Sequence, residues 1–150
     1  MTASESPDPV RARRVDHVAF ATSDADAAAR WYETRLGMTV VGDERVESAG
    51  VRLVYLAPHD QDPDTATMIQ LAEPFAEGAV ATHLRTRGEG FHHVCLTVDD
   101  IDEVLEAAGQ DRGTIFLGGR ERRACFLLEQ PQGVLIELTE THTTHERTPA

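Results

Sequence analysis

The chain has 150 residues, of which 41% are hydrophobic and 27% are charged, a composition typical of one globular domain. Its formal net charge of −12 argues against nucleic-acid partners, because phosphate binding needs a basic surface. The sequence contains neither lysine nor asparagine, which excludes P-loop, Schiff-base and Cys-His-Asn chemistry, and no serine lies in a Gly-x-Ser-x-Gly motif.

Both ends of the sequence are polar, and we expect them to be disordered tails around a domain at residues 15–141. Residues 1–14 contain two prolines and three arginines, and residues 142–150 are rich in threonine. His142 and His145 have a spacing that could hold a metal on a helix, but a threonine-rich tail makes this the weaker interpretation. No apolar run approaches membrane-spanning length, so we expect a cytoplasmic protein without a membrane partner.

The first half of the domain predicts a strand, a helix and three more strands. The first strand begins at His17, and a helix is expected over residues 27–36, closed by Gly37. Ser23 and Asp26 have the spacing of a capping box at the start of this helix. Trp31, Tyr32 and Leu36 are its candidate core-facing residues. The later strands are expected over residues 39–42, 51–56 and 68–73, with a polar loop at 63–67.

The second half repeats this order after a linker at residues 85–90. A strand begins at His93, and a helix around residues 103–108 is closed by Gly109, with Asp100 and Glu103 at capping spacing. Further strands are expected over residues 114–117, 124–128 and 135–140. Each half has aspartates seven and nine residues after its first histidine, and each ends in the pattern x-Ile-(Gln/Glu)-Leu-x-Glu. The class is therefore α+β, with modules at about 15–75 and 91–141 that could pair within one chain or across a homodimer.

Four polar residues occupy equivalent positions in the apolar strands of the two halves. These are His17, Gln70, His93 and Glu137. Buried polar side chains need partners, and two imidazoles, an amide oxygen and a carboxylate suit a divalent ion such as cobalt, manganese, nickel, zinc or ferrous iron. Four protein ligands on an octahedral ion leave two positions for a substrate with two adjacent oxygens, and the ion would stabilise an enolate.

The other histidines of the domain are weaker candidates as ligands. Strand alternation turns His92 to the face opposite His93, so it is left out of the set. His59 and His83 have no counterpart in the other half, and we interpret them as loop and helix-surface residues.

These residues also carry a resemblance to a known family. The paired modules, together with residues 15–19, 87–93, 98–101 and 133–138, resemble the vicinal oxygen chelate superfamily, which includes glyoxalase, bleomycin-resistance and dioxygenase proteins. Within it, the likeness is greatest to methylmalonyl-CoA epimerases, over about residues 14–141.

The resemblance implies a fold, a metal site and a substrate class. Two βαβββ modules would form a cupped mixed sheet around an ion held by His17, Gln70, His93 and Glu137. The thioester and carboxylate oxygens of an acyl or acyl-CoA-like substrate would chelate the ion. A base would remove the α-proton and an acid on the other face would return it. A homodimer is also implied by the resemblance.

The chain departs from the epimerase pattern at the expected second base. Epimerases usually carry Glu-Gln-Gly before the second strand of the first module, whereas residues 45–51 read Arg-Val-Glu-Ser-Ala-Gly-Val. Ser48 stands at the expected glutamate position, where it is a candidate substrate contact. Glu137 and the neighbouring Glu47 are the candidate catalytic residues, and Glu47 would need a bulge to turn inward.

A second departure is the basic loop at residues 118–123. Arg120 and Arg123 are candidates for binding an anionic substrate group, because arginine binds carboxylate and phosphate in a bidentate manner. A solvated charged turn is the competing interpretation.

Three functions follow from these patterns. The first is a metal-dependent, enolate-forming enzyme most like methylmalonyl-CoA epimerase. The second is a glyoxalase-type isomerase or a specialised-metabolism lyase of the same fold, which Ser48 favours. The third is a small-molecule-binding or resistance protein, which the retention of all four candidate ligands disfavours. An extradiol dioxygenase is disfavoured as well. Within the family that this chain resembles, those enzymes hold iron with three protein ligands, whereas this chain has four candidate ligands.

Overall fold

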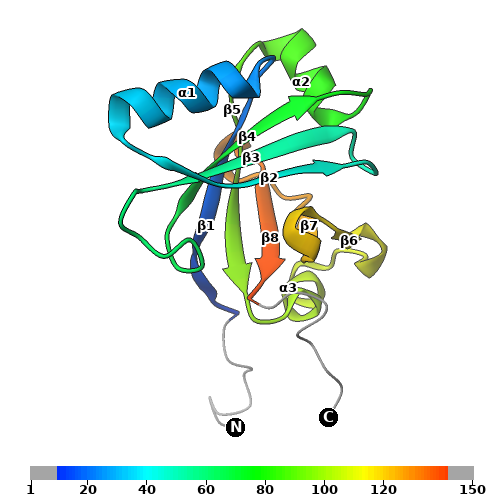
Figure 1. The fold of residues 1–150 in the computed structure, drawn as a ribbon. Helices are drawn as coiled ribbons and strands as arrows, with labels where there is room; N and C mark the ends of the chain where they lie inside the picture. The colour runs from blue at the N-terminus through cyan, green and yellow to red at the C-terminus, as the bar shows by residue number, and fades with distance from the viewer. Residues whose placement is uncertain (1–9, 142–150) are drawn as a thin grey trace, which may run out of the picture.

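Two modules meet along the central strands of an eight-stranded mixed sheet in the computed structural model, which describes residues 10–141 (Figure 1). The first contains β1 (Ala12–Ala21), α1 (Ala25–Leu36), β2 (Thr39–Val46), β3 (Val51–Ala57) and β4 (Met68–Pro74). After α2 (Ala79–Arg87), the second contains β5 (Gly90–Val98), α3 (Ile101–Ala108), β6 (Phe116–Leu117), β7 (Arg123–Phe126) and β8 (Ile136–Glu140). The α+β class and the paired βαβββ modules are confirmed.

The strand order is β2-β3-β4-β1-β5-β8-β7-β6. In each module the first strand pairs in parallel with the last, β1 with β4 and β5 with β8. The modules join through the long antiparallel pair of β1 and β5, so they assemble within one chain. The sheet curls around a concave face, as Figure 1 shows, and the four central strands line its base.

The helices α1 and α3 cover the outer face of the sheet. Alternation along β3 sends Val54 and Leu56 toward α1, while Leu53 and Tyr55 face the concave side. Beneath α3, Ile101 and Leu105 pack against strand residues of the second module. The expected core positions Trp31 and Leu36 are wrong, because their side chains are 52% and 60% exposed. The face of α1 that packs on the sheet is a stripe at helical spacing, formed by Ala25, Ala28, Ala29 and Tyr32.

Each of these two helices begins at a carboxylate from the last strand of its own module. Asp24 caps α1 by accepting a hydrogen bond from Ala27 N, so the expected cap at Ser23 is wrong by one residue. Asp100 caps α3 as expected. In addition, Glu73 Oε1 accepts from Ala25 N at 2.7 Å, and Glu140 Oε2 accepts from Ile101 N at 3.0 Å. The final glutamate of the repeated strand pattern therefore holds the first turn of the helix, Glu73 for α1 and Glu140 for α3.

Several element boundaries differ from the sequence prediction. The strand β1 starts at Ala12 instead of following a tail that ends at residue 14, because Ala12 and Arg14 pair with β5. Residues 1–9 and 142–150 of the predicted tails, with His142 and His145, lie outside the described residues. The strand β2 is longer and β6 shorter than expected. The helix α2 was anticipated only through His83 as a helix-surface residue, and it extends into the linker expected at residues 85–90; its bounds were not predicted because it buries only Val80. Within residues 10–141, no helix has the length and apolar character to cross a membrane.

Replacing Glu73 with alanine should lower the free energy of unfolding by about 1–2 kcal/mol, because the first N–H of α1 loses its carboxylate acceptor. Glu73→Gln keeps an acceptor oxygen without the charge, so it should recover part of the loss. Urea unfolding of both variants measures the difference. Equal stability of Glu73→Ala and the wild type would contradict this role.

Candidate metal centre

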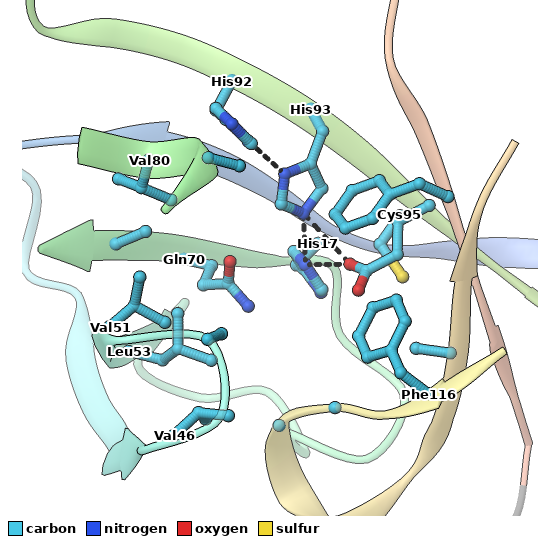
Figure 2. Close-up of a pocket in the computed structure, with 18 of the residues that line it drawn as sticks. His17, Val46, Val51, Leu53, Gln70, Val80, His92, His93, Cys95 and Phe116 are labelled. Carbon is cyan, nitrogen blue, oxygen red and sulfur yellow. Dashed lines mark hydrogen bonds and ion pairs between the residues drawn. The ribbon is translucent and has the colours of Figure 1, made fainter. Parts of the chain in front are cut away.

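Four polar side chains from the four central strands meet at the base of the concave face (Figure 2). They are His17 on β1, Gln70 on β4, His93 on β5 and Glu137 on β8. The Nε2 atoms of His17 and His93 lie 3.4 Å apart. Glu137 Oε1 lies 3.0 Å from His93 Nε2 and 3.4 Å from His17 Nε2. Gln70 is 4% exposed and points into the same cavity. The structure thus brings together the four residues that the sequence nominated as ligands.

The three nearest donor atoms have the spacing of ligands around one ion. Bonds from a first-row metal to imidazole nitrogen or carboxylate oxygen are about 2.1 Å long, so two ligand atoms lie about 3.0 Å apart at a right angle and about 3.4 Å apart at the tetrahedral angle. The separations among His17 Nε2, His93 Nε2 and Glu137 Oε1 match these values. With the amide oxygen of Gln70, this mixed donor set suits a divalent first-row ion.

A buried carboxylate stands behind His17 and orients its ring. The pairing of β1 with β5 is shifted by one residue at Asp16, and this bulge lets the adjacent side chains of Asp16 and His17 both lie inside. Asp16 Oδ2 lies 2.7 Å from His17 Nδ1, so the ring donates from Nδ1 and turns the Nε2 lone pair toward the cavity. Asp16 also forms ion pairs with three guanidinium groups, those of Arg14, Arg120 and Arg122.

The charges of the cluster stabilise one another. Burial opposes ionisation of Asp16, but the hydrogen bond from His17 and the charge of Arg120 outweigh it and hold the pKa of this carboxyl below its usual range. Burial likewise opposes ionisation of Glu137, whose pKa is nevertheless lowered by the two imidazoles. For His17, burial is outweighed by Asp16 and Glu137, which raise its pKa. The surroundings therefore keep the carboxylates of Glu137 and Asp16 anionic and favour a positive charge between them.

Above these donors lies a cavity of about 320 Å³ with mostly apolar walls. The walls are formed chiefly by Val46, Val51, Leu53, Val80, Phe116 and Phe126. Besides Glu137, the described part of the chain contributes one carboxylate to the lining, that of Glu77, which is largely exposed and paired with Arg85. Cys95 lies beside Glu137, and burial raises the pKa of its thiol, which keeps it neutral. The cavity can therefore hold an apolar group next to an ion.

Of the two candidate arginines, the structure brings only Arg120 to the cavity. Its guanidinium lies over the Tyr55 ring, 4.9 Å from the centroid, and pairs with Asp16. Its backbone N–H donates to both carboxylate oxygens of Glu44 on β2. Arg123 instead pairs with Glu140 at 2.9 Å, because alternation along β7 points Ala124 into the cavity and Arg123 toward α3.

The bulge that Glu47 would need to turn inward is absent from the pairing of β2 with β3. The pairing of β2 with β3 is regular from Gly42 to Val46, and Glu47 lies in the turn that follows. Its side chain is 74% exposed, pairs with Arg45 and does not line the cavity. Ser48 does line the cavity. The structure therefore separates Glu47 from the donors and leaves Ser48 at the cavity wall.

Sequence reasoning missed His92 and Tyr55. A second register shift, at His92 on β5, breaks the alternation that was expected to turn this ring away. His92 instead lines the cavity, and its Nδ1 lies 2.7 Å from Nδ1 of His93. Burial, followed by the neighbouring His93 and His83, lowers the pKa of His92 to about 4.

Tyr55 is buried beneath Gly119, where an added Cβ would lie 2.3 Å from the phenol oxygen. Neither the bulge nor this loop crossing leaves a signal in a single sequence.

Residues 16–126 match the family model of the Glyoxalase/Bleomycin resistance protein/Dioxygenase superfamily. The chain belongs to this superfamily. The resemblance stated from the sequence is therefore confirmed at the level of the family.

Named members of the superfamily that resemble this chain are epimerases. The chain is 30% identical to an ethylmalonyl-CoA/methylmalonyl-CoA epimerase of Cereibacter sphaeroides, over 85% of this chain and 97% of the relative. It is 26% identical to the uncharacterised protein YqjC of Bacillus subtilis, over 89% and 99% of the two chains.

Solved structures give the same picture. The crystal structure of methylmalonyl-CoA epimerase from Mycobacterium tuberculosis has a TM-score of 0.78 at 30% identity and covers 98% of this chain and 100% of its own. A variant of the Streptomyces coelicolor methylmalonyl-CoA epimerase, in complex with 2-nitronate-propionyl-CoA, has a TM-score of 0.74 at 31% identity, over 87% and 98% of the two chains. This superfamily member is thus epimerase-like in both sequence and fold.

Replacing Asp16 with asparagine should lower the free energy of unfolding of the metal-free protein by about 3–5 kcal/mol, because Arg120 and Arg122 lose their shared buried anion. The pKa of Asp16 is lowered in the folded state relative to an unfolded value of about 3.9, so its stabilisation is complete above that pH and is lost below it. Wild-type stability should therefore fall more steeply than that of Asp16→Asn as the pH drops below about 4.

Urea unfolding at a series of acidic pH values measures this difference between wild type and variant. Parallel pH profiles for the two proteins would contradict the assigned role of Asp16.

Proposed function

We propose that this protein is a metal-dependent enzyme that removes and returns a proton next to the carbonyl of an acyl-CoA-like thioester, as an epimerase does. The observation that carries the proposal is the close approach of His17 Nε2, His93 Nε2 and Glu137 Oε1, with Gln70 beside them, at the base of an apolar cavity. We assign the ion to these four residues. When bound, it would supply a Lewis acid that stabilises the negative charge on the acyl oxygen as the proton leaves.

Glu137 is the residue to which we assign the proton transfer. Its pKa is held low despite burial by His17 and His93, so at neutral pH it is an unprotonated carboxylate, the form that a general base must have. Because Oε1 faces both imidazoles, Oε2 is the oxygen that we expect to take the proton. The apolar walls would exclude bulk water from this step.

Arg120 is the residue to which we assign recognition of an anionic group on the acyl chain. Among the described residues it is the only arginine in the cavity wall, and its attachment to Asp16, Tyr55 and Glu44 restricts its movement. A fixed guanidinium favours a planar carboxylate, such as that of a malonyl-type acyl group. The acyl-CoA ligand of the Streptomyces coelicolor variant supports this substrate class.

A second candidate, one-base chemistry on the same site, is favoured by the position of Glu47. With this side chain in solvent and Ser48 at the wall, Glu137 has no buried carboxylate as a counterpart among the described cavity residues. A single base can exchange the α-proton, or move it to a neighbouring atom as in a glyoxalase-type isomerase, without inverting the carbon centre.

The wild-type protein, loaded with cobalt(II) and incubated with methylmalonyl-CoA in deuterated water, should incorporate deuterium at the α-carbon. Glu137→Gln should reduce this incorporation by about 100-fold or more, because the proton-accepting carboxylate is lost. Glu47→Gln, which changes an exposed side chain, is the matched control and should leave the rate unchanged. Mass spectrometry gives the incorporation, and a stereospecific assay of the recovered thioester gives the inversion.

The ratio of the inversion rate to the rate of deuterium incorporation separates epimerisation from one-base chemistry. Incorporation accompanied by inversion supports epimerisation, whereas incorporation without inversion supports one-base chemistry. If no deuterium is incorporated with any divalent ion tested and the thioester still binds tightly, the enzyme proposal is wrong and the protein binds a small molecule without converting it.

Ser48→Glu should raise the ratio of inversion to deuterium incorporation by about 10-fold or more, because it adds a carboxylate at the cavity wall where the epimerase pattern has one. The control is Ser48→Gln, whose side chain has about the size of the introduced glutamate but cannot ionise. An unchanged ratio in Ser48→Glu would show that the wall at this position does not face the reacting carbon.

A further inference from the structure

The side chain of His92 lies beside the metal centre although the strand alternation of β5 predicts the opposite. One extra residue is accommodated on β5 between the pairs Ala19–His93 and Phe20–Phe91, and that residue is His92. Its side chain is partly buried, and Figure 2 shows it next to His93 at the top of the donor cluster. The bulge therefore adds a third imidazole to the surroundings of the two candidate ligands.

The distance between the two rings restricts where their protons can be. The Nδ1 atoms of His92 and His93 lie 2.7 Å apart, a hydrogen-bond distance, so one of these nitrogens carries a proton and the other accepts it. His93 Nε2 faces His17 Nε2 and Glu137 Oε1, and a nitrogen that binds a cation must be unprotonated. In the metal-loaded protein the ring proton of His93 is then on Nδ1, and His92 Nδ1 is the acceptor.

The second neighbour of His92 holds its ring in this orientation. His83 on α2 lies edge to face against His92, with ring centroids 5.0 Å apart. On the other side, His93 packs at 5.1 Å against Phe126 of β7. The two adjacent histidines are thus held between α2 and β7, and neither ring can turn without displacing a packed neighbour.

We propose that His92 is a positioning residue: it accepts the Nδ1 proton of His93 and thereby keeps the Nε2 lone pair of His93 directed at the ion. This inference rests on the metal centre of the proposed function. It gives the two imidazole ligands different supports, the carboxylate of Asp16 behind His17 and a neutral imidazole behind His93.

The test compares cobalt(II) binding by the wild type with that of variants at position 92. His92→Phe keeps an aromatic ring but has no acceptor, and it should weaken cobalt(II) affinity by about 10-fold or more. His92→Gln offers an amide oxygen that can accept from His93 Nδ1, so it should recover most of the affinity. Titration against a competing chelator measures both. His59→Gln removes an exposed imidazole paired with Asp60 and is the control for loss of a surface histidine.

Proton NMR of the cobalt(II) proteins supplies a readout that altered packing alone would not reproduce. The wild type should show two strongly shifted, exchangeable N–H signals, from Nδ1 of His17 and of His93. In His92→Phe one of these signals should broaden or disappear through exchange with water, and in His92→Gln it should persist. Asp16→Asn should affect the other signal instead.

The outcomes separate this inference from the function on which it rests. If the wild type binds cobalt(II) and His92→Phe binds it with equal affinity and both N–H signals, the role of His92 is wrong and the metal centre stands. Equal loss of affinity in His92→Phe and His92→Gln would also overturn it. If the wild type binds no divalent ion, both the metal centre and the assigned role of His92 fall together.

Discussion

The antiparallel pairing of β1 with β5 is the interaction on which the rest of the molecule depends. It joins the two modules and sets His17 opposite Cys95 and Ala19 opposite His93, which brings both imidazoles to one point of the concave face. The parallel pairs on either side, β1 with β4 and β5 with β8, add Gln70 and Glu137. A donor set assembled from four separate strands requires all three pairings, so the candidate centre and the fold form together.

Much of this arrangement was accessible from the sequence because the chain is a tandem repeat. Two histidines, two copies of one strand pattern and two glycine-terminated helices specify the modules, and the polar member of each apolar strand identifies the four candidate ligands. The resemblance to a known family then gave the cupped sheet. Repeats are informative in this way because a coincidence of polar residues in buried strands becomes improbable when it occurs twice in corresponding positions.

The features that were missed depend on contacts between residues far apart in the chain. Bulges at Asp16 and His92 turn side chains that strict alternation sends to the other face, and they arise from the fit of β1 against β5. The regular pairing of β2 with β3 kept Glu47 outside. The choice of Arg120 over Arg123 followed from which of two neighbouring backbone positions faces inward on β7. Local sequence contains the residue types for all of these, but not the direction in which they point.

The strands β4 and β8 use both of their faces. Gln70 and Glu137 face the cavity, and three positions later Glu73 and Glu140 accept hydrogen bonds from the first residues of α1 and α3 on the outer face. A slip of either strand by one residue would turn a candidate metal ligand away from the cavity and would also break the hydrogen bond that docks a helix. The register that lets Glu73 and Glu140 hold the helices is thus the same register that directs Gln70 and Glu137 into the cavity. An error in strand pairing would therefore affect both faces of the sheet.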